Sequence, residues 1–207
     1  YEDLIVEESA QAIIAADLED GAIDDPRIET SPAGDVTLVR ASFVNAPSVE
    51  AQGVGVSVEA GPFSLDRFGA VTLSGAATYV DEFTLADPVR GRTIEAAGNR
   101  NFSNFARSIP EFRANAAIDW RLGDAFARAG LRHISAYDDD ENAGAEIDAW
   151  TVADVQAGFE LDRATLSLGA LNLFDADAPF VATPLGYDTK VHDPRGRIAY
   201  ARVSVRY

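Results

Sequence analysis

Apolar and polar residues alternate at every second position along most of this chain. From residue 147 the odd positions are mainly apolar: Ile147, Ala149, Thr151, Ala153, Val155, Ala157, Phe159 and Leu161. The even positions between them include Asp148, Asp154, Gln156, Gly158 and Glu160. Because successive side chains of a β-strand point to opposite faces, this period predicts strands with one apolar and one polar face.

The same period recurs along the chain and predicts about eight strands. They lie near residues 1–6, 54–58, 71–79, 112–120, 125–137, 147–161, 164–170 and 199–207. About six or seven of them reach the length of a tilted membrane strand, roughly 9–11 residues. The strand at 125–137 is the least regular, because Arg128 and Arg132 share one face while His133 falls on the apolar one.

The links between these strands alternate between short and long. Tight turns are predicted at 62–66, 121–124 and 161–163, and long polar links at about 7–45, 85–108, 138–146 and 175–195. A membrane β-barrel has short turns on one rim and long loops on the other. With the C-terminus in the periplasm, every short link falls on the periplasmic rim and every long link outside the cell.

The first long link carries structure of its own. Ser9 is placed to cap a short helix over Ala10 to Leu18, which Gly21 would end. The residues Ser31-Pro32-Ala33-Gly34-Asp35 predict a turn that reverses a hairpin.

The net charge of −17 argues against a nucleic-acid partner, which needs a basic surface. Acidic residues gather in the long links and predict solvated loops. They are Glu7, Glu8, Asp17, Glu19, Asp20, Asp24 and Asp25 in the first link, and Asp138, Asp139, Asp140, Glu141 and Glu146 in the third. Counted from Asp138, the third link has Ala143 and Ala149 where a calcium loop requires glycine and glutamate.

No other chemistry is indicated by motif or spacing. Cysteine is absent, and the two histidines, His133 and His192, are far apart and are expected at a rim or interface rather than at a metal. We expect neither catalytic residues nor a cofactor, and therefore no enzyme.

A soluble β-sandwich would also alternate, so the two classes must be separated by other features. The apolar rows contain many alanines, which fill a two-sheet core poorly. Aromatic residues mark the ends of these rows, as at the two interfaces of a bilayer: Tyr79, Phe112 and Tyr137 at one end, Trp120, Phe159 and Tyr207 at the other. The polar rows carry charges interpreted as pairs, such as Arg113 with Asp119, while Trp150 falls on a polar row and is expected to pack inside. These features favour a membrane barrel.

Several motifs near the C-terminus support this interpretation. They are Asn172-Leu173-Phe174-Asp175, Gly186-Tyr187-Asp188, Asp193-Pro194-Arg195-Gly196-Arg197 and a final alternating strand that ends at Tyr207. With these motifs, residues from about 40 to 207 resemble the C-terminal part of the β-barrel of TonB-dependent receptors. Two earlier stretches, 109–115 and 147–154, resemble strands of the same family.

The resemblance implies a barrel of about 22 strands around a globular plug. It implies an outer-membrane receptor of a Gram-negative bacterium that imports a scarce nutrient, such as a metal–siderophore complex, a vitamin or a glycan. We expect residues 1–207 to be the C-terminal part of that barrel, with the C-terminus periplasmic and the plug, through which TonB would act, outside this chain. The expected partners are outer-membrane lipid, the barrel-assembly machinery and a small-molecule ligand.

The resemblance also assigns roles to individual residues. Ala201, Val203, Val205 and Tyr207 resemble the C-terminal signal that the barrel-assembly machinery recognises. In the motifs before the last strand, Asn172 and Asp175 can bond nearby backbone. Pro194 and Gly196 are interpreted as setting the turn that re-enters the strand.

Two alternatives stay open at this stage. The eight strands could close as a small autonomous barrel with a structural or adhesive role. Less favoured is a soluble β binding module. As an isolated piece of a larger barrel, the chain should instead form an open sheet with two exposed edges.

Overall fold

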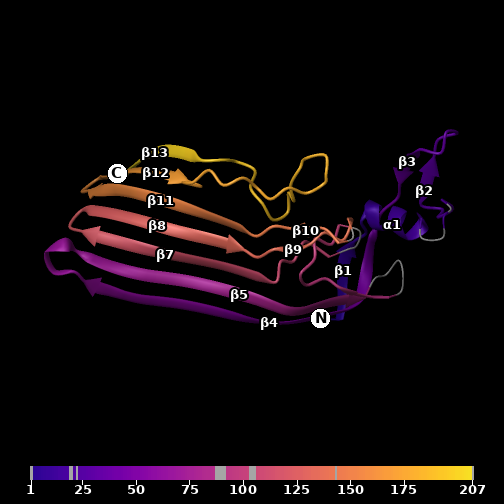
Figure 1. The fold of residues 1–207 in the computed structure, drawn as a ribbon, viewed down its shortest axis with the longest axis horizontal. Helices are drawn as coiled ribbons and strands as arrows, with labels where there is room; N and C mark the ends of the chain where they lie inside the picture. The colour runs from indigo at the N-terminus through magenta and orange to yellow at the C-terminus, as the bar shows by residue number, and fades with distance from the viewer. Residues whose placement is uncertain are drawn as a thin grey trace. The chain divides into compact units, whose positions relative to one another are not determined.

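The structure is a computed structural model, and it describes residues 2–18, 21, 23–86, 92–102, 106–142 and 144–206. Its main sheet has the strand order β1-β4-β5-β7-β8-β11-β12-β13, with β6 paired to β5 (Figure 1). The strands are β1 (Glu2–Glu7), β4 (Phe43–Ser64), β5 (Ala70–Ala86), β6 (Thr93–Glu95), β7 (Phe112–Leu122), β8 (Ala125–Ile134), β11 (Trp150–Leu161), β12 (Ala164–Leu171) and β13 (Ile198–Val205). The predicted all-β antiparallel fold is confirmed, and in this strand order β1 and β13 stand at the two ends of an open sheet.

Tertiary contacts divide the chain into two compact units. The first contains residues 1–53, 80–111 and 137–147, and the second contains residues 54–79, 112–136 and 148–207. Among the described residues, no helix has the length and apolar character needed to cross a membrane.

In the second unit, the strand register aligns residues of the same kind across the sheet. One row runs over six strands through Leu73, Ile118, Ala129, Val155, Ala170 and Ala199. The next row runs through Thr72, Asp119, Arg128, Gln156, Gly169 and Tyr200. The alternation seen within each strand therefore becomes two continuous faces of one sheet, which we call the apolar face and the polar face.

Short turns join the strands of this unit at one end. The turn between β4 and β5 contains the 3-10 turn η2 (Asp66–Phe68), and the indole of Trp120 donates a 2.7 Å hydrogen bond to the Phe68 carbonyl. Gly123 has a φ of +56° in the two-residue turn between β7 and β8, a conformation that favours glycine. The turns predicted at 121–124 and 161–163 are confirmed, whereas the turn predicted at 62–66 lies at 65–69, because β4 continues to Ser64.

The first long link folds locally within the first unit. The helix α1 (Ala10–Asp17) is capped by Ser9, whose Oγ accepts a 3.4 Å hydrogen bond from the Ala12 amide. β2 (Ile28–Thr30) and β3 (Val36–Val39) form a hairpin, and the predicted turn at 31–35 connects them. Both expected elements are thus present, and the helix ends at Asp17, one residue before the predicted limit.

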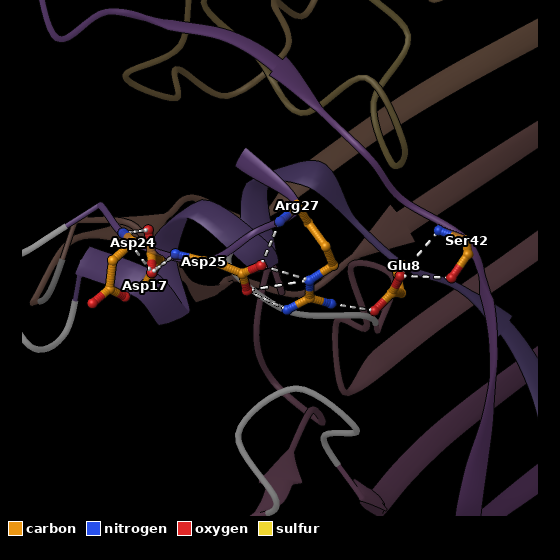
Figure 2. A network of polar contacts seen from close by, with 6 residues as sticks. All are labelled: Glu8, Asp17, Asp24, Asp25, Arg27 and Ser42. Atoms are coloured by element: carbon orange, nitrogen blue, oxygen red, sulfur yellow. Dashed lines mark hydrogen bonds and ion pairs between the residues drawn. The ribbon is translucent and has the colours of Figure 1, made fainter. Parts of the chain in front are cut away.

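A network of polar contacts closes this link at its base (Figure 2). The buried carboxylate of Glu8 accepts hydrogen bonds from Arg27 at 2.7 Å and from the Ser42 amide and hydroxyl at 3.0 and 2.9 Å. Hydrogen bonding by Arg27 lowers the pKa of the Asp25 carboxyl to about 2. Asp17 accepts the backbone amides of Asp24 and Asp25 at 3.1 and 2.9 Å. The carboxylates of Glu8, Asp17 and Asp25 therefore hold the link together, and the expectation of a solvated acidic link is wrong for these three residues.

The third acidic link is also built into the structure of the first unit. Here β9 (Tyr137–Asp138) and β10 (Glu146–Ile147) form a small hairpin. The carboxylate of Asp139 is buried and accepts a 2.7 Å hydrogen bond from Arg100, which is buried as well. Burial raises the pKa of Asp139, but hydrogen bonds from Asn142 and Arg100 outweigh burial and hold the pKa below its usual value. Asp139 is therefore an ion-pair residue of the loop rather than a solvated charge.

The structure corrects several predicted strand boundaries. The strand expected near 54–58 extends over Phe43–Ser64, and the strand expected near 71–79 extends over Ala70–Ala86. The strand expected over 125–137 ends at Ile134, and the strand expected from residue 147 is interrupted before Trp150. As a result Tyr137 lies in the β9–β10 hairpin with only 3% of its surface exposed, so its assignment to an aromatic girdle is wrong. The first unit also has a core of its own, formed by Val49, Leu85, Ala96 and Ala106 with Phe83, Ile94 and Ile109 packed against them.

The Glu8 network generates a first prediction. Replacing Glu8 with Gln keeps the size of the side chain but removes the charge that strengthens its three hydrogen bonds. We expect the free energy of local opening of residues 23–42, measured by amide hydrogen exchange, to fall by about 1–3 kcal/mol. The matched control is Glu29→Gln, because Glu29 pairs with Arg40 at the surface and such pairs contribute about 0–1 kcal/mol. Equal effects of the two substitutions would contradict the conclusion that the Glu8 carboxylate holds the first long link together.

Candidate functional site

The apolar face of the second unit is open to its surroundings along the length of the strands. Leu168 on β12 and Val203 on β13 each have 67% of their surface exposed, and many other large apolar side chains on this face are exposed too. They include Leu73, Ile118, Leu131, Phe159, Leu161, Leu166 and Val205. Soluble monomers rarely expose an apolar surface of this extent, whereas a membrane strand presents one to lipid.

The opposite face carries a series of ion pairs between neighbouring strands. Arg128 on β8 bonds to Asp119 on β7 at 2.8 Å, and Arg132 on β8 bonds to Asp154 on β11 at 3.1 Å. Asp119 is thus paired across strands, and the expected pairing of Asp119 with Arg113 is wrong. The two lie six residues apart on β7, roughly 20 Å at the usual rise per residue.

Hollows along this face are lined by the same charged side chains. One of about 320 Å³ is bounded by Arg128, Arg132, Asp154 and Tyr200. A second of about 300 Å³ is bounded by Arg113, Arg132, Trp150 and Asp193, among others. Guanidinium, carboxylate, amide and phenol groups offer both donors and acceptors, so the face is suited to polar, hydrated contacts rather than to lipid.

The motif that begins at Asn172 fastens the end of β12 to this polar face. Asn172 has a φ of +48°, and its side chain both donates to and accepts from the backbone of Ala176, at 2.8 and 2.9 Å. Its own amide donates a 2.9 Å hydrogen bond to Asp154. The carboxylate of Asp154 therefore joins Arg132 on β8 to the first residue of the motif.

The two C-terminal motifs meet at Asp175. Its carboxylate accepts a 2.6 Å hydrogen bond from the amide of Arg197, the last residue of the Asp193–Arg197 motif. A Cβ placed on Gly196 would lie 2.5 Å from the same carboxylate oxygen. A side chain at residue 196 would therefore force the Asp175 carboxylate to move from its present position. Gly196 does not have a positive φ, so the backbone here does not adopt the left-handed conformation that favours glycine.

The remaining motif residues have separate positions. Asp193 accepts hydrogen bonds from both the amide and the guanidinium of Arg195, which lower the pKa of Asp193 to about 2. The Leu173 amide donates to the Ala153 carbonyl at 2.7 Å, and Phe174 is highly exposed. Pro194 precedes Arg195 in the same turn.

The strand expected to carry the assembly signal is described up to Val205. Ala201, Val203 and Val205 pair with Leu168, Leu166 and Ala164 of β12, so all three lie on the apolar face. Tyr207 lies outside the described residues. Within the described part of the chain, no group of three or more His, Asp or Glu side chains is arranged to hold a metal ion.

Sequence reasoning missed one contact in this region. The rings of Trp150 and His192 pack edge to face with centroids 5.5 Å apart, and both side chains are buried. The inward position of Trp150 was expected from its place on a polar row, but the burial of His192 was not expected. No local pattern indicates it, because His192 comes from a long link about 40 residues further along the chain. His133 lies at the long-loop end of β8 and contacts Thr151 at 2.7 Å.

The close approach at Gly196 generates a second prediction. In a Gly196→Ala variant the new methyl group would displace the Asp175 carboxylate from the Arg197 amide. We expect faster amide exchange at Arg197 and a loss of about 1–3 kcal/mol of stability at the base of the last long link. Gly55→Ala is the control, because a Cβ at Gly55 meets nothing within 4 Å. An unchanged Arg197 amide in the Gly196 variant would refute the steric explanation.

Comparison with known proteins identifies the fold. Residues 15–173 match the family described as TonB dependent receptor-like, beta-barrel. No curated protein sequence matches the chain significantly.

Solved structures give the same result for the fold. A ferric enterobactin receptor (PfeA) mutant from Pseudomonas aeruginosa superposes with a TM-score of 0.56 at 16% identity, over 99% of this chain and 27% of that one. The copper transporter OprC gives 0.52 at 15% identity, over 79% and 24%. The siderophore receptor PirA from Acinetobacter baumannii gives 0.51 at 15% identity, over 85% and 25%. The chain spans about a quarter of the length of these proteins. By its family match, the chain belongs to the β-barrel family of TonB-dependent receptors.

Proposed function

We propose that this chain is the C-terminal part of the barrel of an outer-membrane receptor that takes up a scarce nutrient with energy delivered through TonB. The observation that carries the proposal is the sheet of the second unit. Over six strands its apolar residues align on one exposed face, and its charged and polar residues align on the opposite face. In this arrangement the apolar face contacts lipid and the polar face lines the interior of the barrel.

The links support one orientation in the membrane. The short turns after β4, β7 and β11 lie at one end of the strands, and the long links after β1, β5, β8 and β12 lie at the other. Outer-membrane barrels have short periplasmic turns and longer extracellular loops. We therefore place the C-terminus in the periplasm and the first and third acidic links outside the cell.

The cargo is proposed only as a class. The structural relatives named above are a ferric enterobactin receptor, a copper transporter and a siderophore receptor. Metal ions and metal chelates are therefore the first ligands to test, ahead of vitamins and glycans. The plug and the remaining barrel strands, which would carry gating and the contact with TonB, would be supplied by sequence outside residues 1–207.

A matched pair of substitutions on β4 tests which face contacts lipid. Val56 and Ser57 are neighbours and both are exposed, but they point to opposite faces. Placing arginine on the lipid face of a barrel costs about 2–4 kcal/mol near the bilayer centre, whereas the interior tolerates it. We expect Val56→Arg to lower folding stability in lipid vesicles by this amount, measured by urea titration, and Ser57→Arg to change it little. Equal effects of the two variants would contradict a lipid-facing apolar row.

We further propose that Ala201, Val203, Val205 and Tyr207 form the signal that the barrel-assembly machinery recognises. The described part of this pattern lies on the apolar face of β13, which ends the open sheet. In cells, Tyr207→Ser should reduce the amount of folded receptor in the outer membrane, measured by heat-modifiable gel mobility. The control is Tyr200→Ser on the polar face of the same strand. Normal assembly of the Tyr207 variant would refute the signal.

A further inference from the structure

The last long link returns to the polar face instead of extending away from it. Trp150 occupies a polar-face row with Ile134, Arg113 and Thr78. The His192 ring packs edge-on against Trp150 at a centroid separation of 5.5 Å, and only 5–6% of either residue is exposed. The link is therefore fastened to the sheet at His192, far along the chain from its anchors at Asn172 and Asp175.

The segment that carries His192 is a compact turn. The amide of His192 donates to the Asp188 carbonyl at 2.9 Å, and the amide of Lys190 donates to the Asp188 carboxylate at 2.9 Å. Both neighbours of His192, Val191 and Asp193, line the 300 Å³ hollow together with Trp150, Arg113 and Arg132. Movement of this turn would therefore widen the hollow beside Arg113 and Arg132, which are both exposed.

The charges around His192 come from several elements. Arg113 lies on β7, Arg132 lies on β8, and Asp188, Lys190, Asp193 and Arg195 belong to the link itself. Three of these charges are already paired, since Arg132 bonds to Asp154, and Asp193 and Arg195 bond to each other. Burial lowers the pKa of His192, the charge of Asp188 opposes this effect, and the charge of Arg113 adds to it.

We propose that the turn from Asp188 to His192 is a pH-sensitive strap over the long-loop end of the polar face. Neutral His192 holds the strap against Trp150. Protonation releases it and opens the hollow that Arg113 and Arg132 line. Histidine is the side chain whose charge changes between about pH 5 and 8, so the strap would respond to mild acidification.

The direction of the pH effect follows from the two states of the imidazole. In the open strap His192 is solvated and titrates near its usual value of 6.5, whereas in the closed strap its pKa is lowered by burial. The open state therefore binds more protons than the closed state. Closure is fully favoured above about pH 6.5 and weakens as the pH falls below it, with about a tenfold loss in the closing equilibrium for each unit separating the two pKa values.

Amide hydrogen exchange on the complete gene product in detergent micelles tests this proposal. The protection of residues 188–192 is measured at pH 7.5 and 5.0 and corrected for the intrinsic pH dependence of exchange. We expect protection to be lower at pH 5.0 than at pH 7.5, because the open state binds the additional proton. Constant protection in the unmodified protein would overturn the proposal.

Two variants distinguish His192 from other titrating groups. His192→Phe keeps an aromatic ring against Trp150 but cannot be protonated, so its protection should not change with pH, and His192→Gln serves the same purpose where Phe does not pack. His133→Phe is the matched control, because it replaces the other histidine of the chain and should leave the pH response intact. A pH response that persists in both His192 variants, or disappears in His133→Phe, would assign the effect elsewhere and refute the strap. These outcomes do not depend on cargo or on TonB.

Discussion

A two-residue period in each strand, combined with a register that keeps like residues opposite one another, is the constraint on which this structure depends. A shift of one residue between any two strands would mix the two faces. In the second unit the rows stay aligned from β5 to β13, so alanine, leucine and valine lie on one side and arginine, aspartate and glutamine on the other. Within each pair of neighbouring strands the backbone groups bond to one another, as a lipid environment requires.

The charged residues follow from the same constraint. Side chains on the polar face lie close enough to pair across strands, which places Arg128 against Asp119 and Arg132 against Asp154. Both pairs are partly exposed, and pairs of this kind contribute about 0–1 kcal/mol each. They therefore neutralise charge along the polar face more than they stabilise the sheet. The buried pair of Arg100 and Asp139 differs, because removing one partner would leave a buried charge without compensation.

Most of the sheet could be predicted from the sequence because strand periodicity and turn residues are local signals. The alternating rows, two of the three tight turns, the Ser9-capped helix and the family are all confirmed. Contacts between distant segments carry no such signal. The partner of Asp119, the burial of Tyr137 and the pairing of Asp139 with Arg100 each depend on how separate segments meet in space.

The C-terminal motifs illustrate the same division. Asn172 and Asp175 do bond nearby backbone, as their residue types suggested. The residue type of Gly196 suggests a role in the turn conformation. In the structure its φ is not positive, and its contact is instead with the Asp175 carboxylate of the other motif. The packing of His192 on Trp150 was not anticipated for a related reason, since a histidine in a long polar link gives no indication of where it docks.

Site-directed spin labelling along β4 tests the central claim most directly. The chain has no cysteine of its own, so single cysteines can be introduced at each position from 54 to 59 and labelled in lipid vesicles. Labels at Val54, Val56 and Val58 should be accessible to oxygen dissolved in the bilayer, and labels at Gly55, Ser57 and Glu59 to a water-soluble nickel complex. Accessibility that alternates with this period would support an apolar face in contact with lipid. Equal access of the nickel complex to all six positions would contradict it.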